Sequence, residues 1–163
     1  MTISIDVKVE DQPLRDALAQ LRRRLDDLTP AMSVIGRIVR ASVVRNFEAG
    51  GRPRWPVSVR ARREGGMTLI NSARLMRSVT AQASRDSVAV GTNVAYAAIH
   101  QFGGRTGPRV IEPKKKKALR TPYGIFRRVR HPGSKIPARP FLAVQTEDWT
   151  EIAAAVNDYL TGR

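Results

Sequence analysis

The stretch Tyr96-Ala-Ala-Ile-His-Gln-Phe-Gly-Gly104 places small, apolar and aromatic residues in the middle of a strongly basic sequence. Tyr96, Ile99 and Phe102 recur at helical spacing, which predicts one or two helical turns with a single apolar face. The helix is expected to stop at the paired glycines, where a left-handed or closely packed backbone is available. A helix this short needs packing from its neighbours, and the preceding stretch 87–92 has the pattern of a strand that would supply it.

The composition points to an anionic partner, because the formal net charge is +15 over 163 residues. The chain has no cysteine, which excludes disulfides and thiolate metal sites. It also lacks a long apolar run or a basic-then-apolar leader, so we expect a soluble, intracellular protein without a membrane span. The length favours a single domain, 1–163, that carries a long basic arm at about 105–135.

The N-terminal third predicts a strand and two helices. Apolar and polar residues alternate over 3–9, as in a half-buried strand. Leucines then follow steps of four and three over 14–28, which predicts a helix lying on a sheet, with a coiled-coil seam as the alternative. A second helix should begin at Thr29-Pro30 and end at Gly50-Gly51. The next residues contain two prolines and form a turn that Trp55 anchors.

The middle of the chain predicts an exposed loop to Gly66, a capped helix and a hairpin. Asn71 or Ser72 would cap the helix within 69–79, and the hairpin would run over 79–90. A last helix should follow residue 142 with Trp149 facing inward and with acidic residues in its first turn, where they suit the helix dipole.

The segment 105–139 has a different character, with twelve Lys or Arg residues against the single acid Glu112. Glycines and prolines recur through it, so an extended hairpin or partly mobile arm is favoured over a helix. The segment ends in Ile136-Pro-Ala-Arg-Pro-Phe-Leu142, which should return to the core through Phe141. We hypothesise that the segments around Phe102 and Phe141 meet at the root of the arm. The expected fold class is α+β, with a small antiparallel sheet packed against N-terminal and C-terminal helices and a long basic β-rich arm.

Several motifs in a fixed order resemble the phage virion morphogenesis family, the tail-completion proteins that include Mu-type G proteins. The strongest are Tyr96-Ala-Ala-Ile-His-Gln-Phe-Gly103 and the run 136–142. Others are Phe47-Glu-Ala-Gly-Gly-Arg-Pro-Arg-Trp55, Val90-Gly91-Thr92, and Leu69-Ile70 with Arg74-Leu75. Ser72-Ala73 stands where many members of the family have Thr-Gly. The resemblance runs from about residue 40 to the C-terminus.

The resemblance implies a structural protein that completes or terminates the phage tail and joins it to the head connector. The expected assembly is a homo-oligomeric ring, with six subunits as the expected number. Its location would be the tail or neck of the virion, after assembly in the host cytoplasm. The expected partners are tail-tube and neck or connector proteins, while non-specific contact with packaged DNA stays open. Aromatic and motif residues are the candidate assembly contacts: Trp55, Tyr96, His100, Gln101, Phe102, Arg139 and Phe141.

Non-specific nucleic-acid binding through the arm is the alternative function. Exposed cations beside Tyr123 and Phe126 would hold phosphates while the aromatic rings stack on bases. The candidate cations of the arm are Lys114, Lys115, Lys116, Lys117, Arg120, Arg127, Arg128 and Arg130. An enzyme is disfavoured, because the only histidines are His100 and His131 and neither has an acid pair at a known catalytic or metal-binding spacing. No catalytic residue, metal or cofactor is therefore expected.

Overall fold

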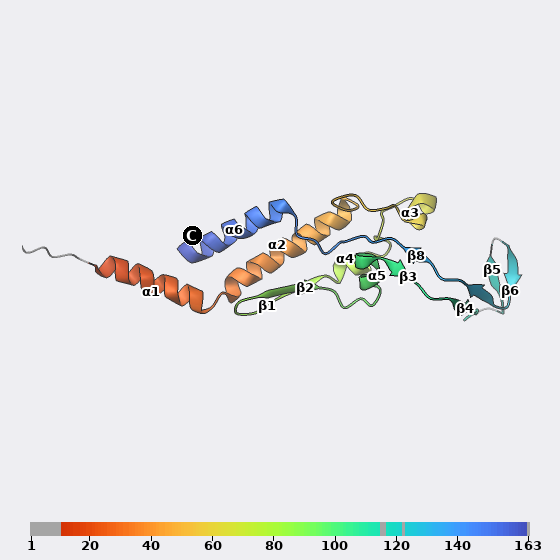
Figure 1. Ribbon diagram of the computed structural model, residues 1–163, viewed down its shortest axis with the longest axis horizontal. Helices are drawn as coiled ribbons and strands as arrows, with labels where there is room; N and C mark the ends of the chain where they lie inside the picture. Colours follow the sequence, from red (N-terminus) through yellow and green to blue (C-terminus); the bar gives the residue numbers. More distant parts are fainter. Residues whose placement is uncertain (1–10, 115–116, 122, 163) are drawn as a thin grey trace, which may run out of the picture. The chain divides into compact units, whose positions relative to one another are not determined.

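The computed structural model describes residues 11–114, 117–121 and 123–162, so the strand expected at 3–9 lies outside the described residues. The described residues form six helices and eight short strands and have the predicted α+β class (Figure 1). Its residues gather into two compact units. The first contains the residues up to 42 together with 80–91 and 144–163, and the second contains 43–79 and 92–143.

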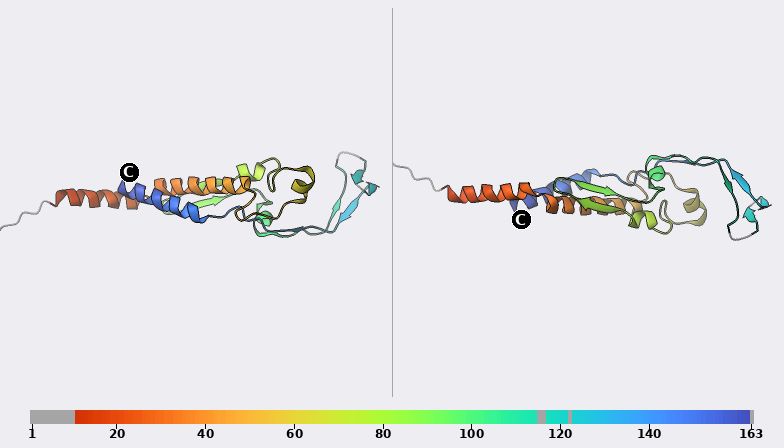
Figure 2. Two further views of the ribbon diagram at one scale, coloured as in Figure 1. Left: turned by 90° about the horizontal axis from the view of Figure 1, so that it is seen from above. Right: turned by 90° about the horizontal axis from the view of Figure 1, so that it is seen from below.

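Three helices and one hairpin form the first unit. They are α1 (Gln12–Asp26), most of α2 (Thr29–Glu48), α6 (Thr146–Thr161), and the antiparallel strands β1 (Thr80–Ala83) and β2 (Val88–Gly91). Figures 1 and 2 show the hairpin and α6 running alongside α2. The helix α2 begins and ends where the sequence predicts.

The start of α2 is capped by Asp27 and not by the expected Thr29. The Asp27 carboxylate accepts from the Thr29 backbone N–H at 2.9 Å. Hydrogen bonds from the Thr29 side chain and backbone lower the pKa of Asp27, because they favour the ionised carboxylate. Asp27 therefore satisfies a backbone donor that a helix start leaves unpaired.

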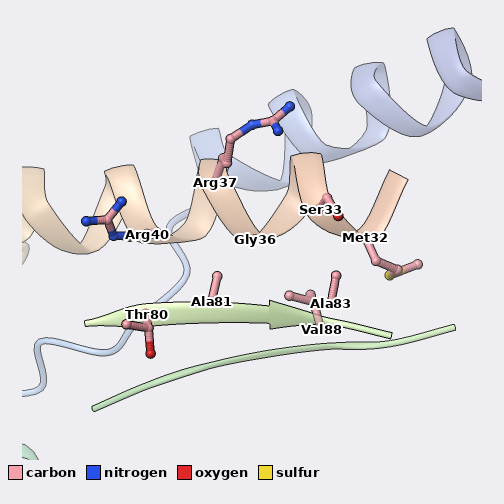
Figure 3. A pocket seen from close by; sticks show the side chains of 9 residues that line it. All are labelled: Met32, Ser33, Gly36, Arg37, Arg40, Thr80, Ala81, Ala83 and Val88. Atoms are coloured by element: carbon pink, nitrogen blue, oxygen red, sulfur yellow. The ribbon is translucent and has the colours of Figure 1, made fainter. Parts of the chain in front are cut away.

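The β1–β2 hairpin packs on α2 at Gly36, which is buried. Figure 3 shows Ala81, Ala83 and Val88 pointing toward this helix. A Cβ atom at Gly36 would lie 2.9 Å from the Cβ of Ala81 and 3.0 Å from a Val88 methyl. The absence of a side chain at Gly36 therefore permits the close approach of helix and hairpin.

The helix α6 is attached to α2 by a buried carboxylate. Asp148 is fully buried, accepts from the hydroxyl of Ser42 and also accepts from the Gln145 backbone N–H at 2.7 Å. Gln145 and Asp148 form a reciprocal capping box. The inward position expected for Trp149 is wrong, because its side chain is 62% exposed.

Within the described residues, the leucine stripe of α1 lies on no sheet. Leu14, Leu18, Leu21 and Leu25 are all exposed, and no residue of this helix is buried. Two hydrogen bonds to α6 hold the helix near its C-terminal end: Arg24 donates to the Leu160 carbonyl at 2.7 Å, and Tyr159 donates at 2.5 Å to the carbonyl of Asp27, just after the helix. The spacing correctly predicted the helix but not what its apolar face contacts.

The second unit contains three short helices, α3 (Val59–Glu64), α4 (Arg74–Arg77) and α5 (Ala97–Phe102). The loop expected before Gly66 is in part α3, which Ser58 caps by accepting from the Ala61 backbone N–H at 3.2 Å. The helix expected over 69–79 is shorter, because Leu69 and Ala73 adopt positive φ angles of 64° and 57°. Neither Asn71 nor Ser72 caps it.

The arm is a long antiparallel hairpin, as predicted, built from successive strand pairs. The pairs are β3 (Gly104–Arg105) with β8 (Lys135–Ile136), β4 (Arg109–Ile111) with β7 (Val129–His131), and β5 (Leu119–Thr121) with β6 (Gly124–Phe126). The described residues contain no helix long and apolar enough to cross a membrane.

Candidate assembly interface at the root of the arm

The helix α5 ends where the chain enters the arm. Gly103 has a φ of 72°, and a Cβ atom there would lie 2.7 Å from the Ala138 backbone nitrogen. A larger residue would therefore push the outgoing and returning segments of the arm apart. The paired glycines have the role that the sequence predicts for them.

Gln101 joins α5 to the returning segment 136–142. Its side-chain oxygen accepts from the backbone N–H groups of Phe141 at 2.9 Å and Leu142 at 3.0 Å. Its side-chain nitrogen donates to the Leu142 carbonyl at 3.1 Å, and the Arg139 backbone N–H donates to the His100 carbonyl at 2.7 Å. The two segments therefore meet, as hypothesised, through Gln101 and the backbone of His100.

Behind this contact lies an aromatic cluster of Phe47, Trp55 and Phe141. The Phe47 ring centroid is 5.7 Å from that of Trp55, in an edge-to-face arrangement, and 5.2 Å from that of Phe141. All three side chains are buried. Two of the candidate contact residues, Trp55 and Phe141, are therefore buried in the core of the second unit.

Asn46 completes this cluster, although the sequence analysis did not single it out. Its side-chain nitrogen donates to the carbonyls of Pro140 at 3.2 Å and Phe141 at 3.1 Å, while its oxygen accepts from the Arg52 backbone N–H at 2.7 Å. A polar residue one position before Phe47, at the apolar end of α2, could have indicated such a role.

His100 and Arg139 lie together beside an open cleft of about 410 Å³. Arg139 is only 6% exposed, and its Nε donates to the Pro56 carbonyl at 2.8 Å. Burial lowers the pKa of Arg139. Burial, followed by the charge of Arg139, also lowers the pKa of His100, whose ring meets that of Tyr96 edge-on at 5.8 Å. The Nδ1 atom of His100 is buried and has no hydrogen-bond partner among the described residues.

The remaining candidate contacts face outward. Phe102 is 79% exposed, so its ring takes no part in the contact between the two segments, and Tyr96 is 43% exposed. The candidate set therefore divides into buried residues that build the root of the arm and two aromatic residues on its surface. Their role as assembly contacts stays a prediction.

The arm exposes both its charges and its aromatic tip. Tyr123 is 91% exposed, and Ile125, Phe126 and Val110 are also exposed. The exposed candidate cations of the arm are Lys114, Lys117, Arg120, Arg127, Arg128 and Arg130, whereas Lys115 and Lys116 lie outside the described residues. Within the part of the chain that the structure describes, no group of three or more His, Asp or Glu side chains could hold a metal ion.

A family model described as the phage virion morphogenesis family matches residues 9–161. The chain belongs to the phage virion morphogenesis family. The Mu-like prophage FluMu G protein 2 of Haemophilus influenzae is 31% identical over 156 residues, which cover 95% of both chains. No solved structure matches the chain. Membership of the virion morphogenesis family gives the chain a structural role in building a phage particle.

Proposed function

We propose that the protein is a structural component of the head-tail neck or tail end, where it assembles as a ring and completes the tail for joining to the head connector. The observation that carries this proposal is the exposed leucine stripe of α1. A row of four exposed leucines on one helix is an apolar surface typical of a protein-protein contact.

The charges beside this stripe disfavour pairing of α1 with a second α1. Arg15, Arg22 and Arg24 occupy the positions that flank a leucine seam with this spacing, so two such helices would face each other with like charges. The natural partner is therefore a different surface, with acidic residues beside apolar ones. Contacts between two different surfaces of identical subunits generate rings when the rotation closes.

The chain itself offers such a surface on α6. This helix has no basic residue, and it exposes Trp149 together with the acidic residues Glu147, Glu151 and Asp158. In a contact between α1 of one subunit and α6 of the next, the leucine stripe and its flanking arginines would meet the exposed Trp149 and the acidic residues of α6. We include this contact in the proposal.

The test is a phage that cannot make this protein. Electron microscopy of its lysate should show filled heads and separate tails in place of joined particles, and the wild-type protein supplied in trans should restore joining. Joined particles with normal tails in the absence of the protein would contradict the proposal.

Non-specific nucleic-acid binding is the second candidate function. It is favoured by the exposed cations of the arm beside Tyr123 and Phe126, since cations neutralise phosphates and aromatic rings can stack on bases. Duplex binding by the purified chain that weakens steeply with added salt, and that is lost when Arg127 and Arg128 are replaced by Gln, would support it.

A further inference from the structure

The cleft beside His100 is strongly cationic. Its described lining residues include Arg60, Arg74 and Arg139, and none of the described lining residues is acidic. Ser58, Asn71 and Ser72 add polar groups, while Leu75 and Tyr96 contribute apolar surface. A concave site with converging cations and no carboxylate of its own has the composition of an anion-binding site.

Arg139 makes this composition significant because only 6% of the residue is exposed. Its side chain makes one hydrogen bond, from Nε to Pro56, and it forms no ion pair within the described residues. Buried charges in proteins are normally paired, since an uncompensated charge in a low-dielectric site is costly. The terminal nitrogens of Arg139 thus retain donors for an anion in the cleft.

The other wall of the cleft is fixed in place by Arg60. Its guanidinium donates to the carbonyls of Met67 at 2.7 Å and Ile70 at 2.8 Å, which fixes the loop before α4. Arg74, the first residue of α4, is exposed, and its side chain has no hydrogen-bond or ion-pair partner among the described residues. Arg60 therefore shapes the wall, and Arg74 is available to a ligand.

We propose that this cleft binds a carboxylate side chain presented by a neighbouring protein subunit, with Arg139 and Arg74 as its partners. An arginine fork matches the planar, two-oxygen geometry of a carboxylate. A single side chain can enter a half-enclosed cleft that has apolar as well as cationic lining residues. The phosphates of duplex DNA would instead contact the exposed cations of the arm. The proposal rests on the proposed assembly function only in naming a protein subunit as the source of the carboxylate.

The test uses the purified full chain at about 0.15 M salt, where attraction to the arm is partly screened. A capped tetraglutamate peptide, inorganic phosphate and a short DNA duplex are added separately while NMR follows the Arg139 Nε–H resonance and the His100 ring. The charged and titratable groups that line the cleft together with His100 are Arg139, Arg60, Arg74 and Tyr96. A carboxylate added among them should raise the depressed pKa of His100, since it favours the charged imidazolium.

We expect the peptide to shift both resonances and Arg74→Gln to weaken that binding about tenfold, the loss typical of one charged hydrogen bond. Arg77→Gln is the matched control, because Arg77 lies on the same helix but does not line the cleft. A double variant, Arg127→Gln with Arg128→Gln, tests for peptide binding to the arm. It should leave the peptide-induced shifts unchanged.

Unmoved Arg139 and His100 resonances at saturating peptide would overturn the proposal. Shifts caused by phosphate or the duplex but not by the peptide would also overturn it and would make the cleft a phosphate site. Neither result bears on the role in the neck or tail, because no particle is assembled in this experiment.

Discussion

At the scale of single residues, the root of the arm depends on Gln101. Replacing it with Leu removes three hydrogen bonds to residues 141–142 and leaves backbone donors without a partner. We expect a loss of about 2 to 4 kcal/mol in the free energy of unfolding. Urea unfolding measures the effect, and Gln82→Leu at an exposed position of β1 is the control, for which we expect a change below about 0.5 kcal/mol.

Gly103 gives a second prediction at this scale. Gly103→Ala places a methyl group 2.7 Å from the Ala138 backbone nitrogen at a φ of 72°. We expect a destabilisation of roughly 1 to 3 kcal/mol. Gly107→Ala is the control, since no atom lies within 4 Å of its Cβ position. Equal thermal midpoints for the two variants would show that the close approach at Gly103 is not required.

The lowered pKa of His100 predicts that the free energy of unfolding depends on pH. Its pKa is lowered in the folded chain, so the unfolded chain binds more protons between the folded pKa and the ordinary value near 6.5. The contribution of His100 to the free energy of unfolding is then fully present above about pH 6.5, and it is lost as the pH drops through that window. Urea unfolding between pH 8 and pH 5 should show this fall, and His100→Gln should reduce it. A pH profile that is the same in the variant and the wild type would contradict the role of His100 in this fall.

At the scale of elements, α1 carries the prediction about assembly. Leu18→Glu should leave the stability of the isolated chain within about 0.5 kcal/mol of wild type, because Leu18 is exposed. The same change should abolish the oligomer. Ala19→Glu, which adds the same charge on the opposite side of the helix from the leucine stripe, should preserve it. Sedimentation velocity distinguishes the two outcomes, and loss of assembly in both variants would indicate a charge effect and not a specific seam.

The elements also show what sequence patterns can and cannot predict. Long periodic stripes located α1, α2 and α6, and the alternation over 79–90 located the hairpin. The helix α3 was missed because six residues with only Ala61 buried give no periodicity. The helix α4 was overestimated because the positive φ angles of Leu69 and Ala73 depend on tertiary contacts. Periodicity also cannot say what an apolar face contacts: it predicts an inward Trp149 and a helix α1 lying on a sheet, whereas Trp149 and the α1 leucines are exposed.

The candidate site was predictable only in part. The motifs identified His100, Gln101, Arg139 and Phe141, and the paired glycines marked the entrance to the arm. The pairing of Gln101 with a segment 40 residues away leaves no local pattern. The cationic cleft likewise depends on residues that come together from separate loops.

At the scale of the whole molecule, we expect a protein whose exposed apolar surfaces are covered only after it assembles with partners. The exposed leucines of α1, Phe102 and Trp149, and the tip of the arm are surfaces that partners would cover. The mass of the purified chain by light scattering, over a dilution series and a salt series with and without duplex DNA, tests this directly. We expect one closed oligomer, whose mass does not change on dilution or on addition of DNA. A monomer at every concentration that binds the duplex with steep salt dependence would contradict it.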